Sequence, residues 1–357
     1  MPFLDLRAET ASVRADLDAA LACTLDEARF VGGSAVAEFE RAWAAFCGTT
    51  HAVGVASGTA ALELALRAAG VTSGDEVIVP ANTCIPTVAA VETAGATPVL
   101  VDANPVAWTL DPDGLADAVT PRARAVVPVH LYGRPAEREG ILSLAREREL
   151  TVVEDAAQAH GARGVGSFGA AAAFSFYPTK NLGALGDAGA IVSDDDEVAE
   201  RARRLRNYGE DARYHSVEEG TNSRLDTLQA AVLLAKLPHL VRWNERRREL
   251  AARYDRLLAD LPLDRPEWDD AAVWHLYVVR VRDRDAFRRA LEARGVETAV
   301  HYPRAVHEHP AYRHLARPGG FPVAEALARE VVSLPLHPSL TDAEQDAVVE
   351  AIAAWAR

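Results

Sequence analysis

Sulfur-containing residues are scarce in this chain of 357 residues, which has 3 cysteines and 1 methionine. Cys23, Cys47 and Cys84 are widely spaced and odd in number, so they indicate neither a disulfide framework nor a zinc site. Cys84 could act as a nucleophile, but a buried structural thiol is the simpler interpretation. The sequence therefore predicts a reduced, cytoplasmic protein.

Long apolar runs and an excess of positive charge are also missing. No run approaches the ~20 residues of a membrane helix, and the first residues do not follow the signal-peptide pattern. A formal net charge of −14 argues against nucleic acid or an anionic membrane as the main partner. A local basic pocket for a phosphorylated ligand remains compatible with this charge.

Short apolar runs alternate with helical patterns between about residues 50 and 195. The segments TAALELALRAAG and REGILSLARERE have helical spacing. The runs that read as strands are HAVGVAS, DEVIVP, TPVLVD, RAVVPVH, LTVVED, AAFSFY and GAIVSD. This alternation predicts an α/β fold with a mostly parallel seven-stranded sheet covered on both faces.

The pattern changes after about residue 225, where long helices are interrupted near Pro238. Beyond them, strand and helix patterns alternate at lower density, as in VWHLYVVRVRD and RDAFRRALEARG. We therefore expect a large cofactor-binding domain at residues 1–239 and a smaller α/β domain at residues 240–357.

Ligands of such sheets gather at the carboxyl ends of the strands. Polar residues stand at these ends in several of the predicted strands, and they are Ser57, Asn82, Asp102, His130, Asp155 and Tyr177. We expect the functional site among them.

One glycine pattern, GVGSFG, matches the dinucleotide-binding fingerprint through Gly164, Gly166 and Gly169. That fingerprint should end a strand and open a helix. The following residues, AAAAFSFYP, instead read as a strand that runs into a proline turn. The context disfavours a nicotinamide-dependent dehydrogenase.

A better phosphate site lies in VASGTAALELALRAAG, where a strand passes into a helix through Ser57, Gly58 and Thr59. Helix starts carry free N–H groups and a positive dipole end, which favour an anion. Gly58 lacks the Cβ that would block close approach. An ordinary N-cap by Ser57 or Thr59 is the alternative interpretation.

Two charged residues stand in otherwise apolar or small-residue surroundings. Asp155 closes the run LTVVED, and a buried carboxylate there requires a partner, either a bound cation or an arginine. Lys180, in FSFYPTKNLGALGDAGA, is the one cation between Arg163 and Arg201. An exposed turn lysine is the simplest interpretation of Lys180 alone. Together with the helix start, however, the pair supplies the three contacts of a pyridoxal phosphate enzyme.

Several long segments carry a family resemblance, among them FVGGSAVAEFERAWAAFCGTTHAVGVASGTAALELAL, GDEVIVPANT, VEDAAQAHGA, FSFYPTKNLGALGDAGA, TNSRLDTLQAAVLLAKL and VHYPRAVHEHPAY. The chain resembles the DegT/DnrJ/EryC1/StrS family of pyridoxal phosphate aminotransferases over nearly its whole length. The resemblance implies the aspartate aminotransferase (type I) fold and amino transfer to a keto sugar.

The resemblance also implies roles for individual residues. Lys180 forms the Schiff base, Asp155 pairs with the pyridine nitrogen, and Gln158 lies near the cofactor ring. The phosphate is held by Gly58, Thr59 and Ser175 and, from the neighbouring subunit of a homodimer with shared active sites, by Asn222. His301 and Tyr302 belong to a loop near the sugar or its diphosphate.

The loop NTCIPT departs from the family, which commonly has an aromatic residue at the position of Cys84 and a small residue at that of Pro86. Ring stacking on the cofactor is therefore expected to come from elsewhere or to be weaker.

Four histidines cluster in HYPRAVHEHPAYRH, namely His301, His307, His309 and His314. Imidazoles are common metal ligands, but the spacing matches no catalytic zinc site. Polar side chains on an exposed surface are the competing interpretation, and no metal is predicted.

The segment YPTKNLGALGDAG is similar to the corresponding segment of enzymes that aminate C3 of nucleotide-linked keto-deoxy sugars. We therefore expect transfer from L-glutamate to a dTDP-linked 3-keto sugar, in deoxyamino-sugar and antibiotic biosynthesis. The alternatives are a 4-keto sugar, a keto-cyclitol, and a pyridoxal phosphate-binding regulator without turnover.

Overall fold

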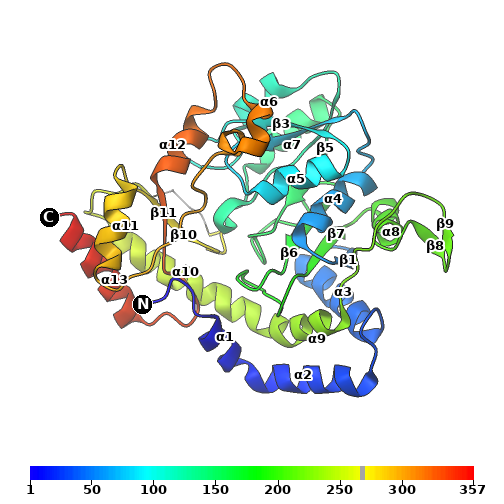
Figure 1. Ribbon diagram of the computed structural model, residues 1–357, viewed down its shortest axis with the longest axis horizontal. Coiled ribbons are helices and arrows are strands. Elements are labelled where there is room, and N and C mark those ends of the chain that lie inside the picture. Colours follow the sequence, from blue (N-terminus) through cyan, green and yellow to red (C-terminus); the bar gives the residue numbers. More distant parts are fainter. Residues whose placement is uncertain (266–269) are drawn as a thin grey trace.

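The fold is built around the predicted seven-stranded sheet, seen in a computed structural model that describes residues 1–265 and 270–357. The strands lie in the order β1-β7-β6-β5-β4-β2-β3 (Figure 1). Their bounds are β1 His51–Val55, β2 Glu76–Pro80, β3 Thr97–Val101, β4 Ala123–Val126, β5 Thr151–Asp155, β6 Ala171–Ser175 and β7 Gly189–Ser193. Each lies within or next to one of the apolar runs, so the sequence prediction of the sheet is confirmed.

Strand β7 is antiparallel to both of its neighbours, β1 and β6, whereas β6, β5, β4, β2 and β3 pair in parallel. Strand β1 therefore points the same way as β6. The carboxyl ends of β1, β5 and β6 consequently meet at one edge of the sheet, which is where α/β folds bind ligands.

Helices cover both faces of the sheet. One face packs against α4 (Gly58–Ala68), α5 (Ile85–Thr93) and α8 (Asp196–Leu205). The other packs against α3 (Ser34–Cys47) and α9 (Thr227–Lys236) on one side, and α6 (Pro112–Ala118) and α7 (Arg138–Glu147) on the other. Burial on both faces explains why the strands read as continuous apolar runs rather than alternating ones.

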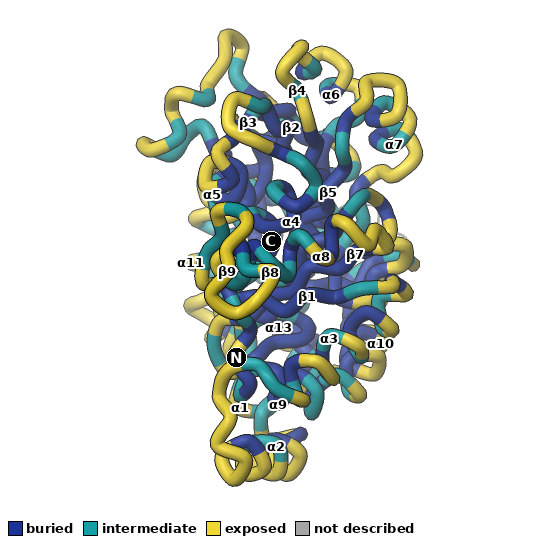
Figure 2. The backbone as a smooth tube through the Cα atoms, turned by 90° about the vertical axis from the view of Figure 1, so that its right-hand side faces the viewer, coloured by how far each residue is buried: buried dark blue, intermediate teal, exposed yellow. Residues whose placement is uncertain are grey.

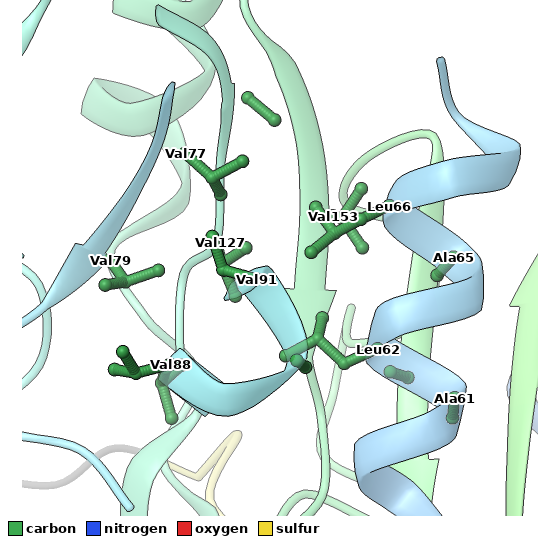
Figure 3. Close-up of a cluster of buried hydrophobic side chains, with 14 of the residues drawn as sticks. Ala61, Leu62, Ala65, Leu66, Val77, Val79, Val88, Val91, Val127 and Val153 are labelled. Atoms are coloured by element: carbon green, nitrogen blue, oxygen red, sulfur yellow. The ribbon is translucent and has the colours of Figure 1, made fainter. Parts of the chain in front are cut away.

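The core between α4, α5 and the sheet consists of aliphatic side chains. Figure 3 shows Leu62 and Leu66 of α4 directed toward the sheet, where Val153 of β5 lies. All three side chains are buried. Each such leucine contributes roughly 1.5–3 kcal/mol to folding. This packing fixes the start of α4 relative to the ends of β5 and β6.

The C-terminal part has a small core of its own. Strands β10 (Tyr277–Arg280) and β11 (Val331–Leu334) form an antiparallel pair. They pack against α10 (Leu240–Leu257), α11 (Arg284–Glu292) and α13 (Asp342–Trp355). Helix α12 (Pro322–Glu330) instead packs in the same core as α4 and α5. The division at residue 239 stays a prediction.

The predicted break near Pro238 is a 3-10 turn, Leu237–His239, between α9 and α10. At the N-terminus, α1 (Leu6–Ser12) leads into α2 (Arg14–Glu27), which lies along α9 (Figure 1). A hairpin of β8 (Glu210–Ala212) and β9 (His215–Ser216) stands out as an exposed loop beside α8, while the central strands are buried (Figure 2). Within the described ranges, none of the helices has the length and apolar character required to cross a bilayer.

Candidate active site

A cavity of about 480 Å³ lies at the carboxyl edge of the sheet. It is bounded by the ends of β1, β5 and β6 and by the start of α5. His275, just before β10, and His301 and Tyr302, in the segment between α11 and α12, complete its wall. Eight of the nine predicted site residues line it, and these are Gly58, Thr59, Asp155, Gln158, Ser175, Lys180, His301 and Tyr302.

The predicted phosphate site is the junction of α4, β6 and β7. Ser57 is the N-cap of α4, and its Oγ accepts a 3.2 Å hydrogen bond from the N–H of Ala60. A Cβ on Gly58 would lie 2.4 Å from Cβ of Ser175, and one on Gly189 would lie 2.3 Å from the carbonyl oxygen of Ser57. The three segments thus approach closely only because glycine occupies both positions, and the first amides of α4 open onto the cavity wall.

Asp155 ends β5 with its carboxylate held from two directions. Its Oδ2 accepts a 2.7 Å hydrogen bond from the hydroxyl of Thr87, and its Oδ1 accepts one of 3.1 Å from the N–H of Ala157. Thr87 lies 2.8 Å from the hydroxyl of Thr83, and because Thr87 donates to Asp155, Thr83 donates to Thr87. This one-way chain fixes the orientation of the carboxylate.

Lys180 follows Pro178 in a turn after β6, and its N–H donates a 2.8 Å hydrogen bond to the carbonyl of Tyr177. The side chain is half-buried and lines the cavity. Burial lowers the pKa of the Lys180 amine, and the negative charge of Asp155 offsets that change in part. A larger fraction of the amine is therefore neutral, and nucleophilic, than on an exposed lysine.

Gln158 and Tyr302 are joined on the opposite side of the cavity. The Oε1 of Gln158 accepts a 2.6 Å hydrogen bond from the N–H of Tyr132, and its Nε2 donates a 3.0 Å bond to the hydroxyl of Tyr302. The Tyr132 hydroxyl donates to the carbonyl of His301. His301 Nδ1 lies 2.8 Å from the hydroxyl of Ser333, and burial lowers the pKa of His301 to about 4. At neutral pH this imidazole is uncharged.

The structure has no aromatic ring at position 84, where the sequence predicted weaker stacking on the cofactor. Cys84 lines the cavity as an N-cap of α5 without an aromatic ring, and burial raises the pKa of its thiol. The aromatic or imidazole rings along the described cavity wall instead come from Tyr177, His275, His301 and Tyr302.

Asn222 lies outside this cavity. It is exposed and forms an isolated antiparallel bridge with Asn207, close to the β8–β9 hairpin. Its role in a neighbouring subunit stays a prediction.

Three of the six strand-end residues have structural partners elsewhere. Asn82 donates a 3.0 Å hydrogen bond to the carbonyl of Trp108, and the carboxylate of Asp102 accepts from the N–H groups of Val323 and Ala324. The imidazole of His130 pairs with the buried carboxylate of Glu154 at 2.9 Å. Position at a strand end therefore selects candidates but does not by itself select the site.

Thr87 and His275 are among the cavity-lining residues that sequence reasoning missed. Thr87 sits one helical turn after Thr83, a spacing that places both hydroxyls on one face. His275 stands just before β10, about 95 residues after Lys180, and no local pattern marks it.

The GVGSFG segment leads into β6 rather than a helix, in agreement with the sequence interpretation. Its glycines do not line the cavity. The clustered histidines have separate neighbours, since His307 pairs with Glu325 and His314 with Glu92. Among residues 1–265 and 270–357, no group of three or more His, Cys, Asp or Glu side chains is arranged to hold a metal ion.

The residues of the cavity fit pyridoxal phosphate. The start of α4 can receive the phosphate, because Gly58, Thr59 and Ser175 line the cavity at the N-terminus of that helix. Asp155 can face a protonated ring nitrogen, and Lys180 offers a partly neutral amine at the same cavity.

Comparison with known proteins agrees with this arrangement. A model of the DegT/DnrJ/EryC1/StrS aminotransferase family matches residues 12–353. The dTDP-3-amino-3,4,6-trideoxy-alpha-D-glucose transaminase of Streptomyces venezuelae is 50% identical, with 100% of this chain and 96% of that protein covered. The erythromycin biosynthesis sensory transduction protein EryC1 of Saccharopolyspora erythraea is 49% identical, with 100% of both chains covered.

A solved structure has nearly the same fold. The crystal structure of S. venezuelae DesV in complex with a ketimine intermediate superposes with a TM-score of 0.97 at 50% identity, and covers 100% of this chain and 98% of that one.

Proposed function

Because this chain belongs to the DegT/DnrJ/EryC1/StrS aminotransferase family, we propose that it is a pyridoxal phosphate-dependent aminotransferase of nucleotide-linked keto sugars. The amino donor is L-glutamate, and the acceptor is the C3 ketone of a dTDP-linked deoxy sugar. The observation that carries the proposal is the cavity that combines Lys180, Asp155 and the start of α4. The name of the 50% identical transaminase supports the C3 position.

When bound, pyridoxal phosphate supplies an electron sink for cleavage of the donor's Cα–H bond. Asp155, oriented by Thr87 and the N–H of Ala157, keeps a negative charge beside the ring nitrogen. At about 4 Å such a pair is worth on the order of 4 kcal/mol at an effective dielectric of 20. This charge favours the protonated, electron-poor ring.

Lys180 has two tasks in this scheme. Its amine holds the cofactor covalently between turnovers, and once displaced it can accept a proton at Nζ and return it to a neighbouring carbon. The lowered pKa leaves a larger fraction of Nζ unprotonated, and so able to act as a base, than on an exposed lysine. Gly58, Thr59 and Ser175 would hold the phosphate, Gln158 would lie beside the ring, and His301 and Tyr302 would contact the sugar side.

The test of this function is direct. Purified protein incubated with L-glutamate and a dTDP-3-keto-6-deoxy sugar should release 2-oxoglutarate and form the 3-amino sugar, identified by NMR. Borohydride should attach the cofactor covalently to the peptide that contains Lys180, and Lys180→Ala should abolish both results. Transamination by Lys180→Ala would overturn the assignment.

We also propose a homodimer that shares its active sites. The cofactor phosphate, glutamate and a nucleotide diphosphate are all anionic, whereas Lys180 is the one lysine or arginine among the described residues that line the cavity. A second copy that places Asn222 and other exposed polar groups of its own at this cavity would complete the anion site. The exposed apolar residues Tyr177 and Leu185 near the cavity support such a contact.

Mixing two inactive variants tests the shared site. Lys180→Ala and Asn222→Asp dimers, unfolded together and refolded, should regain about a quarter of wild-type activity, because half of the dimers then contain one intact site. Sedimentation should give the mass of two chains. No recovery from the mixture, with normal recovery from refolded wild-type protein, contradicts the shared site.

The name of the 49% identical EryC1 favours a second candidate, a regulator that binds the cofactor without turnover. It predicts glutamate binding without 2-oxoglutarate release. Substrates with a 4-keto sugar or a keto-cyclitol, run beside the 3-keto sugar, separate the remaining acceptors.

A further inference from the structure

A continuous chain of buried hydrogen bonds runs beneath the cavity. Nδ1 of His275 lies 3.0 Å from Oδ1 of Asn181, and Nδ2 of Asn181 donates at 2.9 Å to Oδ1 of Asn244. Nδ2 of Asn244 donates at 2.8 Å to the carbonyl of His160, whose Nε2 lies 2.8 Å from the carbonyl of Ser175.

The donor and acceptor of each hydrogen bond in this series follow from the groups that take part. Asn181 also donates through Nδ2 to the carbonyl of Val273, so its Oδ1 can only accept and His275 must carry its proton on Nδ1. The carbonyl of Ser175 likewise requires a proton on Nε2 of His160. Burial lowers the pKa of His160 to about 3 and holds that of His275 well below its usual value, so both rings are neutral.

The chain joins three parts of the site that are far apart in sequence. Ser175 ends β6 at the predicted phosphate site, Asn181 directly follows Lys180, and His275 lines the cavity just before β10. Asn244 lies in the middle, on the first turns of α10, and is buried like Asn181. Its side-chain amide accepts a hydrogen bond from Asn181 and donates one to the backbone of His160.

We propose that Asn244 is a positioning residue, whose amide fixes the Lys180 turn against the strand end that carries Ser175. Its Oδ1 holds Asn181 and its Nδ2 holds the His160 backbone, so the spacing between the amine and the phosphate site is set from α10. This inference rests on the proposed function only in taking Lys180 as the reacting amine.

Asn181 and Asn244 are buried, so their amides exclude water from the side of the turn next to α10, while the side chain of Lys180 lines the cavity. If Asn244 is truncated, one N–H of the Asn181 amide and the carbonyl of His160 lose their partners, and water must enter to satisfy them. Water beside the turn reduces the burial that lowers the pKa of Lys180. The amine of Lys180 should then titrate at a higher pH.

The amino-acid composition of the protein makes the titration of Lys180 measurable without cofactor. The sequence has 2 lysines, Lys180 and Lys236, and Nζ of Lys236 is held in a buried pair with Glu9 at 2.8 Å. Acetylation by trace acetic anhydride across a pH series, quantified by peptide mass spectrometry in the cofactor-free protein, therefore reports the titration of Lys180 against an internal reference.

Asn244→Ala should raise the pH midpoint of Lys180 acetylation by about half a pH unit or more, which is about threefold less free amine below the midpoint. Gln345→Ala is the matched control, since the buried Gln345 donates at 2.7 Å to the carbonyl of Leu250 on the same helix, α10. It should cost stability without moving the midpoint. Asn244→Ser provides a milder variant with a smaller shift in the same direction, should Asn244→Ala not fold.

Coincident midpoints of wild type and the Asn244 variants overturn the proposal, and so does an equal shift in Gln345→Ala. Wild-type protein without transaminase activity contradicts the proposed function instead. The two failures are separate because acetylation needs neither cofactor nor substrate.

Discussion

The hydroxyl of Thr87 on α5 donates a 2.7 Å hydrogen bond to Oδ2 of Asp155 at the end of β5, across 68 residues of sequence. Both side chains are buried, and the hydroxyl of Thr83 in turn donates to Thr87. The carboxylate of Asp155, which lines the cavity at the end of β5, is thus oriented by α5, the helix that connects β2 to β3.

Replacing Thr87 by valine should weaken catalysis while preserving the fold. Valine keeps the shape but removes a hydrogen bond to a charged group, worth about 1.5–3 kcal/mol, so kcat/KM should fall tenfold or more. Thr93→Val is the control, because Thr93 is exposed on the same helix and donates only to the carbonyls of Ala89 and Ala90. Equal activity of both variants would show that Asp155 needs no such support.

A methyl group at Gly58 should damage the phosphate site. The new Cβ would lie 2.4 Å from Cβ of Ser175, so the start of α4 and the end of β6 must separate at a cost of roughly 1–3 kcal/mol. We expect Gly58→Ala to bind pyridoxal phosphate at least tenfold more weakly, as followed by fluorescence titration. Gly140→Ala is the control, because its Cβ would crowd Glu137 and Pro112, neither of which lines the cavity, and this variant should bind the cofactor normally.

The cofactor-free protein should lose stability as the pH falls from about 6.5 to about 4. Burial lowers the pKa of His301 to about 4, so in this range the unfolded chain takes up a proton that the folded protein does not. This stability is present above pH 6.5 and is lost progressively toward pH 4, by up to about 3 kcal/mol for His301 alone. Urea unfolding at several pH values measures the slope.

His301→Gln should reduce that slope without abolishing it, because burial also lowers the pKa of His160 and His275. His314→Gln should leave the slope unchanged, because solvent reaches His314 in the folded protein. A slope identical in wild type and His301→Gln would place the pH dependence in other groups.

Tyr302→Phe should impair the sugar half of the reaction more than the glutamate half. The substitution removes the hydroxyl that Nε2 of Gln158 contacts at 3.0 Å. A lost hydrogen bond of about 1–2 kcal/mol corresponds to a roughly fivefold to thirtyfold slower sugar half-reaction. Single-turnover rates with each substrate separate the halves. Equal losses in both would assign Tyr302 to cofactor support through Gln158 rather than to the sugar.

The elements that the sequence predicted share a physical basis. The seven strands are short apolar runs closed by glycine, proline or polar residues, and these signals are local. Lys180 and Asp155 were found for the same reason, since a charge among small or apolar residues stands out without any tertiary contact. The exclusion of GVGSFG as a dinucleotide site also needed only the strand that follows it.

The sequence by itself thus determined the α/β architecture, the carboxyl edge of the sheet as the place of the candidate site, and two charged residues, Asp155 and Lys180, that line the cavity there. Tertiary structure alone decided what surrounds that pair: Thr87 on Asp155, His275 at the cavity, and Asn244 beneath Lys180. These contacts join segments separated by about 60 to 95 residues, and their partners are chosen by how the crossover helices and α10 pack. Such packing depends on the whole folded core, which no local pattern encodes.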